Sequence, residues 1–207
     1  TAQTMDPIRV VRRCKVSLIH TLANGDCVYD AGYNLAGWIS LRVRGARGAR
    51  VTLRHGEMLY PDGAVNQENL RTACAEDCYV LRGGKEETYA PRFTYHGFRY
   101  VQLSIEGEVE VLAIEAQQVR SDVRTIGTFS CSDACINGIE KMVVRTEENN
   151  FHGIPTDCPQ RDERMGWLND ATVRMEEAVY HFDLAAFLEK WMWDIRDTQA
   201  PDGSITD

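Results

Sequence analysis

The chain has 207 residues, of which 43% are hydrophobic and 26% charged, as in ordinary globular proteins, and this length allows one or two domains. The formal net charge of -8 argues against nucleic acid or an anionic membrane as a partner, and no apolar run approaches the length of a membrane span. The first residues lack the basic and apolar regions of a signal peptide. We therefore expect a cytoplasmic location, with export left open if the sequence is a piece of a longer protein.

Seven cysteines are scattered along the chain. The pairs Cys74/Cys78 and Cys131/Cys135 have a spacing that can serve a metal, but no histidine lies at ligand spacing beside either pair. We therefore expect free thiols and neither a metal nor another cofactor. Cys158 as a nucleophile is a weaker hypothesis, because an aspartate and a proline flank it and no base lies nearby.

The hydrophobic pattern from residue 6 to about residue 118 has a period of two, which is typical of strands. Residues 38–44 and 50–57 alternate and flank a short glycine-containing turn, which predicts a hairpin. Further strands are expected at residues 27–32, 78–81, 98–105 and 109–119. Many strands with regular turns predict an antiparallel β-sandwich. We interpret His55 and His96, which lie in strand-like runs, as structural residues.

The pattern changes after Arg120, which predicts one domain over residues 1–120 and a second over residues 121–207. Ser132 or Asp133 can cap a first helix. A second helix is expected from Asn169 or Asp170, with Val173, Val179 and Phe182 as its apolar positions. Asp183 can cap a third helix, whose apolar stripe comprises Leu184, Phe187, Leu188, Trp191 and Ile195. Trp191 and Trp193 are expected to pack rather than to bind a ligand.

Charged residues are concentrated in the loop between the first two predicted helices, Gly153 to Asp170. Prolines and glycines interrupt any continuous helix there. Carboxylates and arginines can hold vicinal hydroxyls, and a tryptophan offers a flat face to a sugar ring. The other interpretation is a surface loop tied down by ion pairs. The residues concerned are Asp157, Arg161, Asp162, Glu163, Arg164, Trp167 and Asp170.

The order of these residues, Asp157-Cys158-Pro159-Gln160-Arg161-Asp162-Glu163-Arg164 followed by Gly166-Trp167 and Asp170, resembles the signature of the bacterial α-L-rhamnosidases, glycoside hydrolase family 78. Asn169 departs from the glycine that many members have there. The resemblance implies that Glu163 is the general acid, that Asp157, Arg161 and Asp170 hold rhamnose hydroxyls, and that Trp167 walls the sugar pocket. It also implies inversion of configuration, with a glutamate base far beyond Asp207.

The predicted strands carry further resemblance to this family, in Asp30–Trp38, Leu53–Glu57 and Phe93–Tyr100, so that the likeness covers nearly all of residues 6–207. It implies a β-domain followed by the first helices of an (α/α)₆ barrel, acting on rhamnose-containing glycosides or oligosaccharides. Three helices are too few to close such a barrel. We therefore expect the missing remainder of the barrel as a partner, and expect this chain alone to be inactive.

Two alternatives stay open at this point. The first is a non-catalytic β-sandwich that binds carbohydrate, with a helical stump attached. The second is a structural protein that assembles through the exposed stripes of its helices. Neither alternative gives Glu163 a chemical role.

Overall fold

A computed structural model describes residues 3–205, which fall into two compact units. The sheet unit comprises Val10–Val119 and the short segment Pro159–Asp162. The helical unit comprises the N-terminal segment through Arg9, Arg120–Cys158 and the chain from Glu163 onward. The predicted domains, 1–120 and 121–207, stay a prediction.

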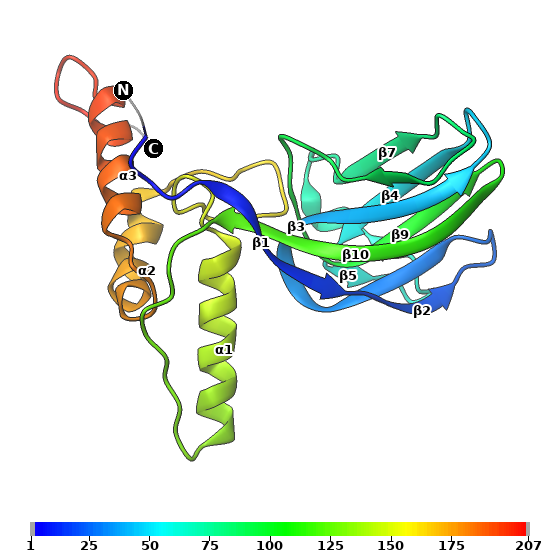
Figure 1. Cartoon of the computed structure of the whole chain (residues 1–207). Helices are drawn as coiled ribbons and strands as arrows, with labels where there is room; N and C mark the ends of the chain where they lie inside the picture. Colours follow the sequence, from blue (N-terminus) through cyan, green and yellow to red (C-terminus); the bar gives the residue numbers. More distant parts are fainter. Residues whose placement is uncertain (1–2, 206–207) are drawn as a thin grey trace. The chain divides into compact units, whose positions relative to one another are not determined.

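The strands of the sheet unit form one large antiparallel sheet, in which β3, β9, β4 and β10 run side by side (Figure 1). Its order is β1-β10-β3-β9-β4-β7, while β2 and β8 also pair with β3, and β5 and β6 form a separate two-stranded sheet. The bounds are β1 Ile8–Lys15, β2 Ser17–Thr21, β3 Cys27–Gly45, β4 Arg50–Gly56, β5 Met58–Leu59, β6 Val65–Asn66, β7 Glu76–Val80, β8 Glu87–Tyr89, β9 His96–Glu106 and β10 Val109–Ser121, with a 3₁₀ turn at Glu68–Leu70.

One face of this sheet carries the core. Alternation along each strand brings the apolar side chains of β3, β4, β9 and β10 to the same side, where they bury one another. His55 of β4 is fully buried beside this core, with its ring edge-on to Phe98 at 4.8 Å between centroids. Burial and the neighbouring His96 lower the pKa of His55 to about 3, so its ring is neutral. The core residues include Leu35, Ile39, Leu41, Val43, Val51, Leu53, Phe98, Val101, Leu103 and Ala116.

The predicted strands 27–32 and 38–44 are a single strand, β3. The chain passes through Gly32 in the left-handed region, at φ 83°, and the Gly32 N–H donates to Asp30 Oδ1 at 2.6 Å. The pairing register with β9 shifts between Asp30 and Leu35. Gly32 therefore marks an irregularity within one strand, where the sequence suggested a strand end.

The predicted hairpin of residues 38–44 and 50–57 is wrong, because β9 lies between β3 and β4. The glycine-containing turn bonds to other segments: the Ala46 N–H donates to Glu108 O and the Gly48 N–H to Leu81 O, each at 2.9 Å. Alternation identifies the buried face of a strand, but it does not identify the strand beside it.

The helical unit contains α1 Ala134–Asn149, α2 Leu168–His181 and α3 Ala185–Thr198 (Figure 1). Asp133 is the N-cap of α1, since its side chain accepts hydrogen bonds from the Cys135 and Ile136 N–H groups. The rings of Phe151, Phe182 and Phe187 meet edge-to-face in the core of this unit. None of the helices in the described chain, residues 3–205, is long and apolar enough to cross a membrane.

Two expectations for the helices are wrong in detail. The N-cap of α3 is Leu184, one residue after the predicted Asp183. The Asp183 carboxylate accepts from Arg124 Nη2 at 2.7 Å and also from the backbone N–H of Ala185. Val173 and Val179 are exposed, while Ala171 and Ala178 are the buried apolar residues of α2. The predicted class was an antiparallel β-sandwich followed by the first helices of an (α/α)₆ barrel. Antiparallel β structure followed by the start of a helical domain is confirmed.

Candidate active site

The loop between α1 and α2 is closed by a short pairing of its two sides. The Asp157 N–H donates to Met165 O at 3.0 Å, and the Met165 N–H donates to Asp157 Oδ1 at 2.7 Å. Asp157 thus uses one carboxylate oxygen to hold the loop in shape. Behind it, Arg174 Nη1 of α2 donates to Thr156 O at 3.0 Å, so that α2 anchors the residue before Asp157.

Glu163 and Trp167 are in direct contact. The indole N–H of Trp167 donates to Glu163 Oε1 at 3.1 Å, and both side chains are partly exposed. Carboxylate atoms of Asp157 and Glu163 and the Cys158 Sγ lie within 4.8 Å of one another. The loop therefore brings three of the predicted site residues, Asp157, Glu163 and Trp167, into one small region.

Asp170 is exposed in the first turn of α2, where the helix dipole favours a carboxylate. Arg161 and Asp162 belong to Pro159–Asp162, the segment that clusters with the sheet unit. This segment lies against β9, because a methyl group built on Gly97 would come within 2.8 Å of Pro159 Cγ. The Asp162 carboxylate bonds to the Thr72 hydroxyl, and this bond holds the pKa of Asp162 below its usual value.

His152 and Arg164 flank the loop. Burial, and secondarily the charge of Arg164, lower the pKa of His152 to about 3, which makes it a neutral ring at physiological pH. Arg164 has a left-handed backbone, at φ 55°, which is uncommon for a residue with a side chain. This turn lies between Glu163 and Met165, the residue whose N–H binds Asp157.

Two groups within residues 3–205 have the donor types and spacing to hold a metal ion: His55, Asp77 and His96 in the sheet unit, and Asp157, Cys158 and Glu163 in the loop. Neither predicted cysteine pair belongs to such a group in this part of the chain. None of the seven cysteines forms a disulfide, and Cys158 is the one that is buried.

A buried carboxyl group that no sequence pattern singles out lies beside Arg174, the residue that anchors the loop. Glu147 of α1 is only 3% exposed, and its Oε1 lies 3.7 Å from Arg174 Nε. Burial raises the pKa of Glu147 to about 7, despite the charge of Arg174. The pair lines a cavity of about 440 Å³ between α1 and α2, together with Glu177. An acidic residue in the last turn of a polar helix carries no sequence signal for burial.

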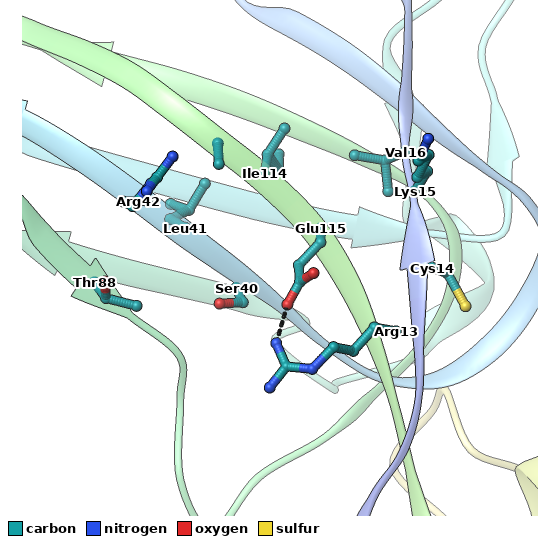
Figure 2. Close-up of a pocket in the computed structure, with 11 residues that line it drawn as sticks. Arg13, Cys14, Lys15, Val16, Ser40, Leu41, Arg42, Thr88, Ile114 and Glu115 are labelled. Carbon is teal, nitrogen blue, oxygen red and sulfur yellow. Dashed lines mark hydrogen bonds and ion pairs between the residues drawn. The ribbon is translucent and has the colours of Figure 1, made fainter.

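A second cavity of about 440 Å³ lies on the sheet unit, beside β1, β3 and β10 (Figure 2). It combines guanidinium groups from Arg13 and Arg42 with the hydroxyls of Ser40 and Thr88 and the apolar Ile114. Arg13 forms an ion pair with Glu115 at its edge. Such a mixture of charged, hydroxyl and apolar groups suits a polar ligand with an apolar face.

Two family models match the chain. Residues 20–122 match the bacterial alpha-L-rhamnosidase concanavalin-like domain, and residues 124–207 match the bacterial alpha-L-rhamnosidase 6 hairpin glycosidase domain.

Known proteins of similar sequence include the alpha-L-rhamnosidase of Streptomyces avermitilis, 38% identical over 207 residues, which are 100% of this chain and 20% of that protein. An alpha-L-rhamnosidase of Formosa agariphila is 31% identical over 209 residues, 97% of this chain and 22% of the relative. The chain thus spans about one fifth of the length of these curated relatives.

Solved structures of α-L-rhamnosidases resemble almost the whole of this chain. The alpha-L-rhamnosidase from Dictyoglumus thermophilum has a TM-score of 0.91 and 43% identity, over 98% of this chain and 23% of that one. The Streptomyces avermitilis enzyme complexed with L-rhamnose has a TM-score of 0.93 and 38% identity, over 100% of this chain and 20% of that one.

Proposed function

Because the chain belongs to the bacterial α-L-rhamnosidase family, we propose that it is the β-domain and first helices of an enzyme that removes terminal α-L-rhamnose with inversion. Its substrates are rhamnose-containing glycosides or oligosaccharides. The observation that best supports this proposal is the contact between Trp167 Nε1 and Glu163 Oε1 at 3.1 Å, within a loop that also carries Asp157.

Glu163 is the proposed proton donor to the glycosidic oxygen. A general acid must present its proton in a fixed direction, and a carboxyl group has two oxygens that can carry it. The Trp167 N–H donates to Oε1, and this contact fixes the direction in which the carboxyl group faces the leaving group. Trp167 therefore has two proposed roles: its ring walls the sugar pocket, and its N–H orients the acid.

Asp157, Arg161 and Asp170 are the proposed contacts to the rhamnose hydroxyls. The Met165 N–H donates to Asp157 Oδ1 and holds this carboxylate in position within the loop. Asp170, exposed at the start of α2, offers a carboxylate on an element that Arg174 ties to the loop. A carboxylate can accept paired hydrogen bonds from neighbouring hydroxyls.

The general base is proposed to lie outside residues 1–207, in the remainder of the helical domain. Inverting glycosidases separate their two carboxyl groups by about 6.5–9.5 Å, to leave room for a water molecule. Asp157 has an oxygen within 4.8 Å of Glu163, which is too close for that role. The 207-residue chain alone should therefore hydrolyse rhamnosides very slowly or not at all.

Trp167→Phe separates the two proposed roles of the tryptophan, because phenylalanine keeps a ring and loses the N–H. We expect kcat on p-nitrophenyl α-L-rhamnoside to fall about 3- to 10-fold, the worth of one hydrogen bond, with KM changed less than about threefold. Steady-state kinetics of the complete enzyme measure this, with exposed Trp193→Phe as the matched control. A rise in KM with unchanged kcat would limit Trp167 to the pocket wall.

A second candidate function is carbohydrate binding by the sheet unit, which the cavity at Arg13, Ser40 and Arg42 favours (Figure 2). Calorimetric titration with L-rhamnose tests it. If this cavity binds the sugar, Arg42→Ser should weaken binding about tenfold or more, the worth of one charge-assisted hydrogen bond, while Trp167→Ala leaves it unchanged. The reverse pattern would assign the binding to the loop between α1 and α2.

A further inference from the structure

The sheet unit contains a buried cluster that the rhamnosidase chemistry does not use. His55 of β4, Asp77 of β7 and His96 of β9 come from three adjacent strands, since β4 pairs with both β7 and β9. Their exposed fractions are 0%, 8% and 4%. Buried ionisable side chains are ordinarily paired or coordinate metals.

The contacts of His55 determine which of its nitrogens carries hydrogen. Its Nδ1 lies 3.3 Å from the Ala75 carbonyl oxygen, which can only accept, so Nδ1 carries hydrogen and donates there. The Nε2 of His55 therefore carries a lone pair. It is completely buried and has no hydrogen-bond partner among residues 3–205.

Asp77 presents a second unpartnered acceptor to the same point. Its Oδ1 bonds to His96 Nε2 at 3.0 Å, whereas its Oδ2 is buried without a hydrogen-bond partner among the described residues. Asp77 Oδ2 lies 3.9 Å from His55 Nε2. Two hydrogen-bond acceptors thus face each other with no hydrogen between them. This arrangement is unfavourable in a buried site, and a bound cation would make it favourable because it attracts both acceptors.

We propose that His55, Asp77 and His96 bind a divalent transition-metal ion, with Zn²⁺ the best fit to two imidazoles and a carboxylate. Zinc bonds of about 2.0–2.1 Å in a tetrahedral site place ligand atoms about 3.3 Å apart. Asp77 Oδ1 lies 3.0 Å from His96 Nε2, and Asp77 Oδ2 lies 3.9 Å from His55 Nε2, so the two distances bracket this spacing. One ligand atom from each of the three residues lies within 4.8 Å of the other two. Nε2 is the nitrogen that each ring turns toward Asp77. The ring planes differ by 21° with centroids 4.2 Å apart, so one ring must rotate for both nitrogens to point at the same ion.

Binding replaces the hydrogen bond between His96 Nε2 and Asp77 with metal bonds from both groups. In a neutral His96 the hydrogen moves from Nε2 to Nδ1, so that Nε2 binds the ion through a lone pair, while His55 contributes its Nε2 and Asp77 a carboxylate oxygen. The ion then links β4, β7 and β9 across the sheet. Its role is structural, because the site is enclosed and contains no exposed ligand.

Metal content of the untagged protein tests this proposal. After equilibration with Zn²⁺ and gel filtration, elemental analysis should find about one zinc per chain. His96→Gln and Asp77→Asn should lower that value at least tenfold. The control, His20→Gln, replaces an exposed histidine outside the cluster and should keep one zinc per chain.

A second measurement does not depend on the variants folding. Co²⁺ added to the wild-type protein should give the visible absorption of a four-coordinate nitrogen and oxygen site, saturating at one equivalent and abolished by Zn²⁺. Zn²⁺ should also raise the Tm of the wild-type protein by several degrees, because an ion bound only to the folded state stabilises it. Less than 0.1 zinc per wild-type chain, or a cobalt spectrum of six water ligands, would overturn the proposal and leave the cluster as a hydrogen-bonded network.

Discussion

Glu163→Gln should lower kcat of the complete enzyme on rhamnosides with poor leaving groups by about 100- to 10,000-fold, the usual contribution of a general acid. Glutamine keeps the carbonyl oxygen that accepts the Trp167 N–H, so the loop geometry is retained while the transferable proton is lost. Activated aryl rhamnosides need less protonation of the leaving oxygen, and their turnover should fall much less. Steady-state kinetics on one disaccharide and one p-nitrophenyl substrate measure both effects.

The adjacent carboxylate supplies the matched control. Asp162 lies one residue from Glu163, but its carboxylate bonds to Thr72 of the sheet unit. Asp162→Asn should therefore keep activity on both substrates within about tenfold of the wild type, since it changes a supporting hydrogen bond. Equal losses on both substrates in Glu163→Gln would show that Glu163 does not protonate the leaving group.

Glu147→Gln should change how the stability of the protein depends on pH. The folded-state pKa of Glu147 is about 7, raised from 4.5 by burial, so the folded protein holds this proton more tightly than the unfolded chain. The contribution of Glu147 to the free energy of unfolding is therefore complete below pH 4.5 and is lost as the pH rises to about 7. The loss is about 2–3 kcal/mol, and glutamine avoids it because it does not ionise.

Urea unfolding of both proteins between pH 4.5 and 8 measures this effect. His55 and His152, with lowered pKa values, give stability the opposite slope below pH 6.5, but they do so in both proteins and cancel in the difference. The free energy of unfolding of Glu147→Gln, relative to that of the wild type, should rise from pH 4.5 to 7 and then level off. Exposed Glu176→Gln, on α2, should show no such trend. Parallel curves for wild type and Glu147→Gln would mean that Glu147 ionises freely.

Local patterns predicted much of this structure. The alternation of Ile39, Leu41 and Val43 identified the buried face of β3, because a half-buried strand repeats every two residues. The stripe of α3 was equally clear, with Phe187 and Trp191 buried at helical spacing. For the candidate site, the order of residues in the loop predicts which residues act, and their roles stay a prediction, while composition alone left a surface loop tied by ion pairs as an alternative.

Contacts between residues that lie far apart in the chain could not be predicted from local sequence patterns. Neither β3 nor β4 carries information that β9, which begins 40 residues after the end of β4 (Gly56 to His96), lies between them. Asp183 has the residue type of a helix cap, but the N-cap position falls on Leu184, and the distant Arg124 side chain gives the Asp183 carboxylate a charged partner that no local pattern indicates. His55, Asp77 and His96 lie far apart in the sequence, and the pairing of their strands brings them together.

Because Pro159–Asp162 packs within the sheet unit, this tetrapeptide should be exchanged together with the sheet when relatives are recombined. A chimera joined once, near residue 120, would take this tetrapeptide from the donor of the helices and set it against Gly97 of a different sheet. Since a methyl group at position 97 would come within 2.9 Å of Gln160 N, a single mismatched side chain there forces the tetrapeptide to move. Positions 97, 159 and 160 should therefore be inherited as a block, and functional hybrids should carry the tetrapeptide of whichever parent supplies the sheet.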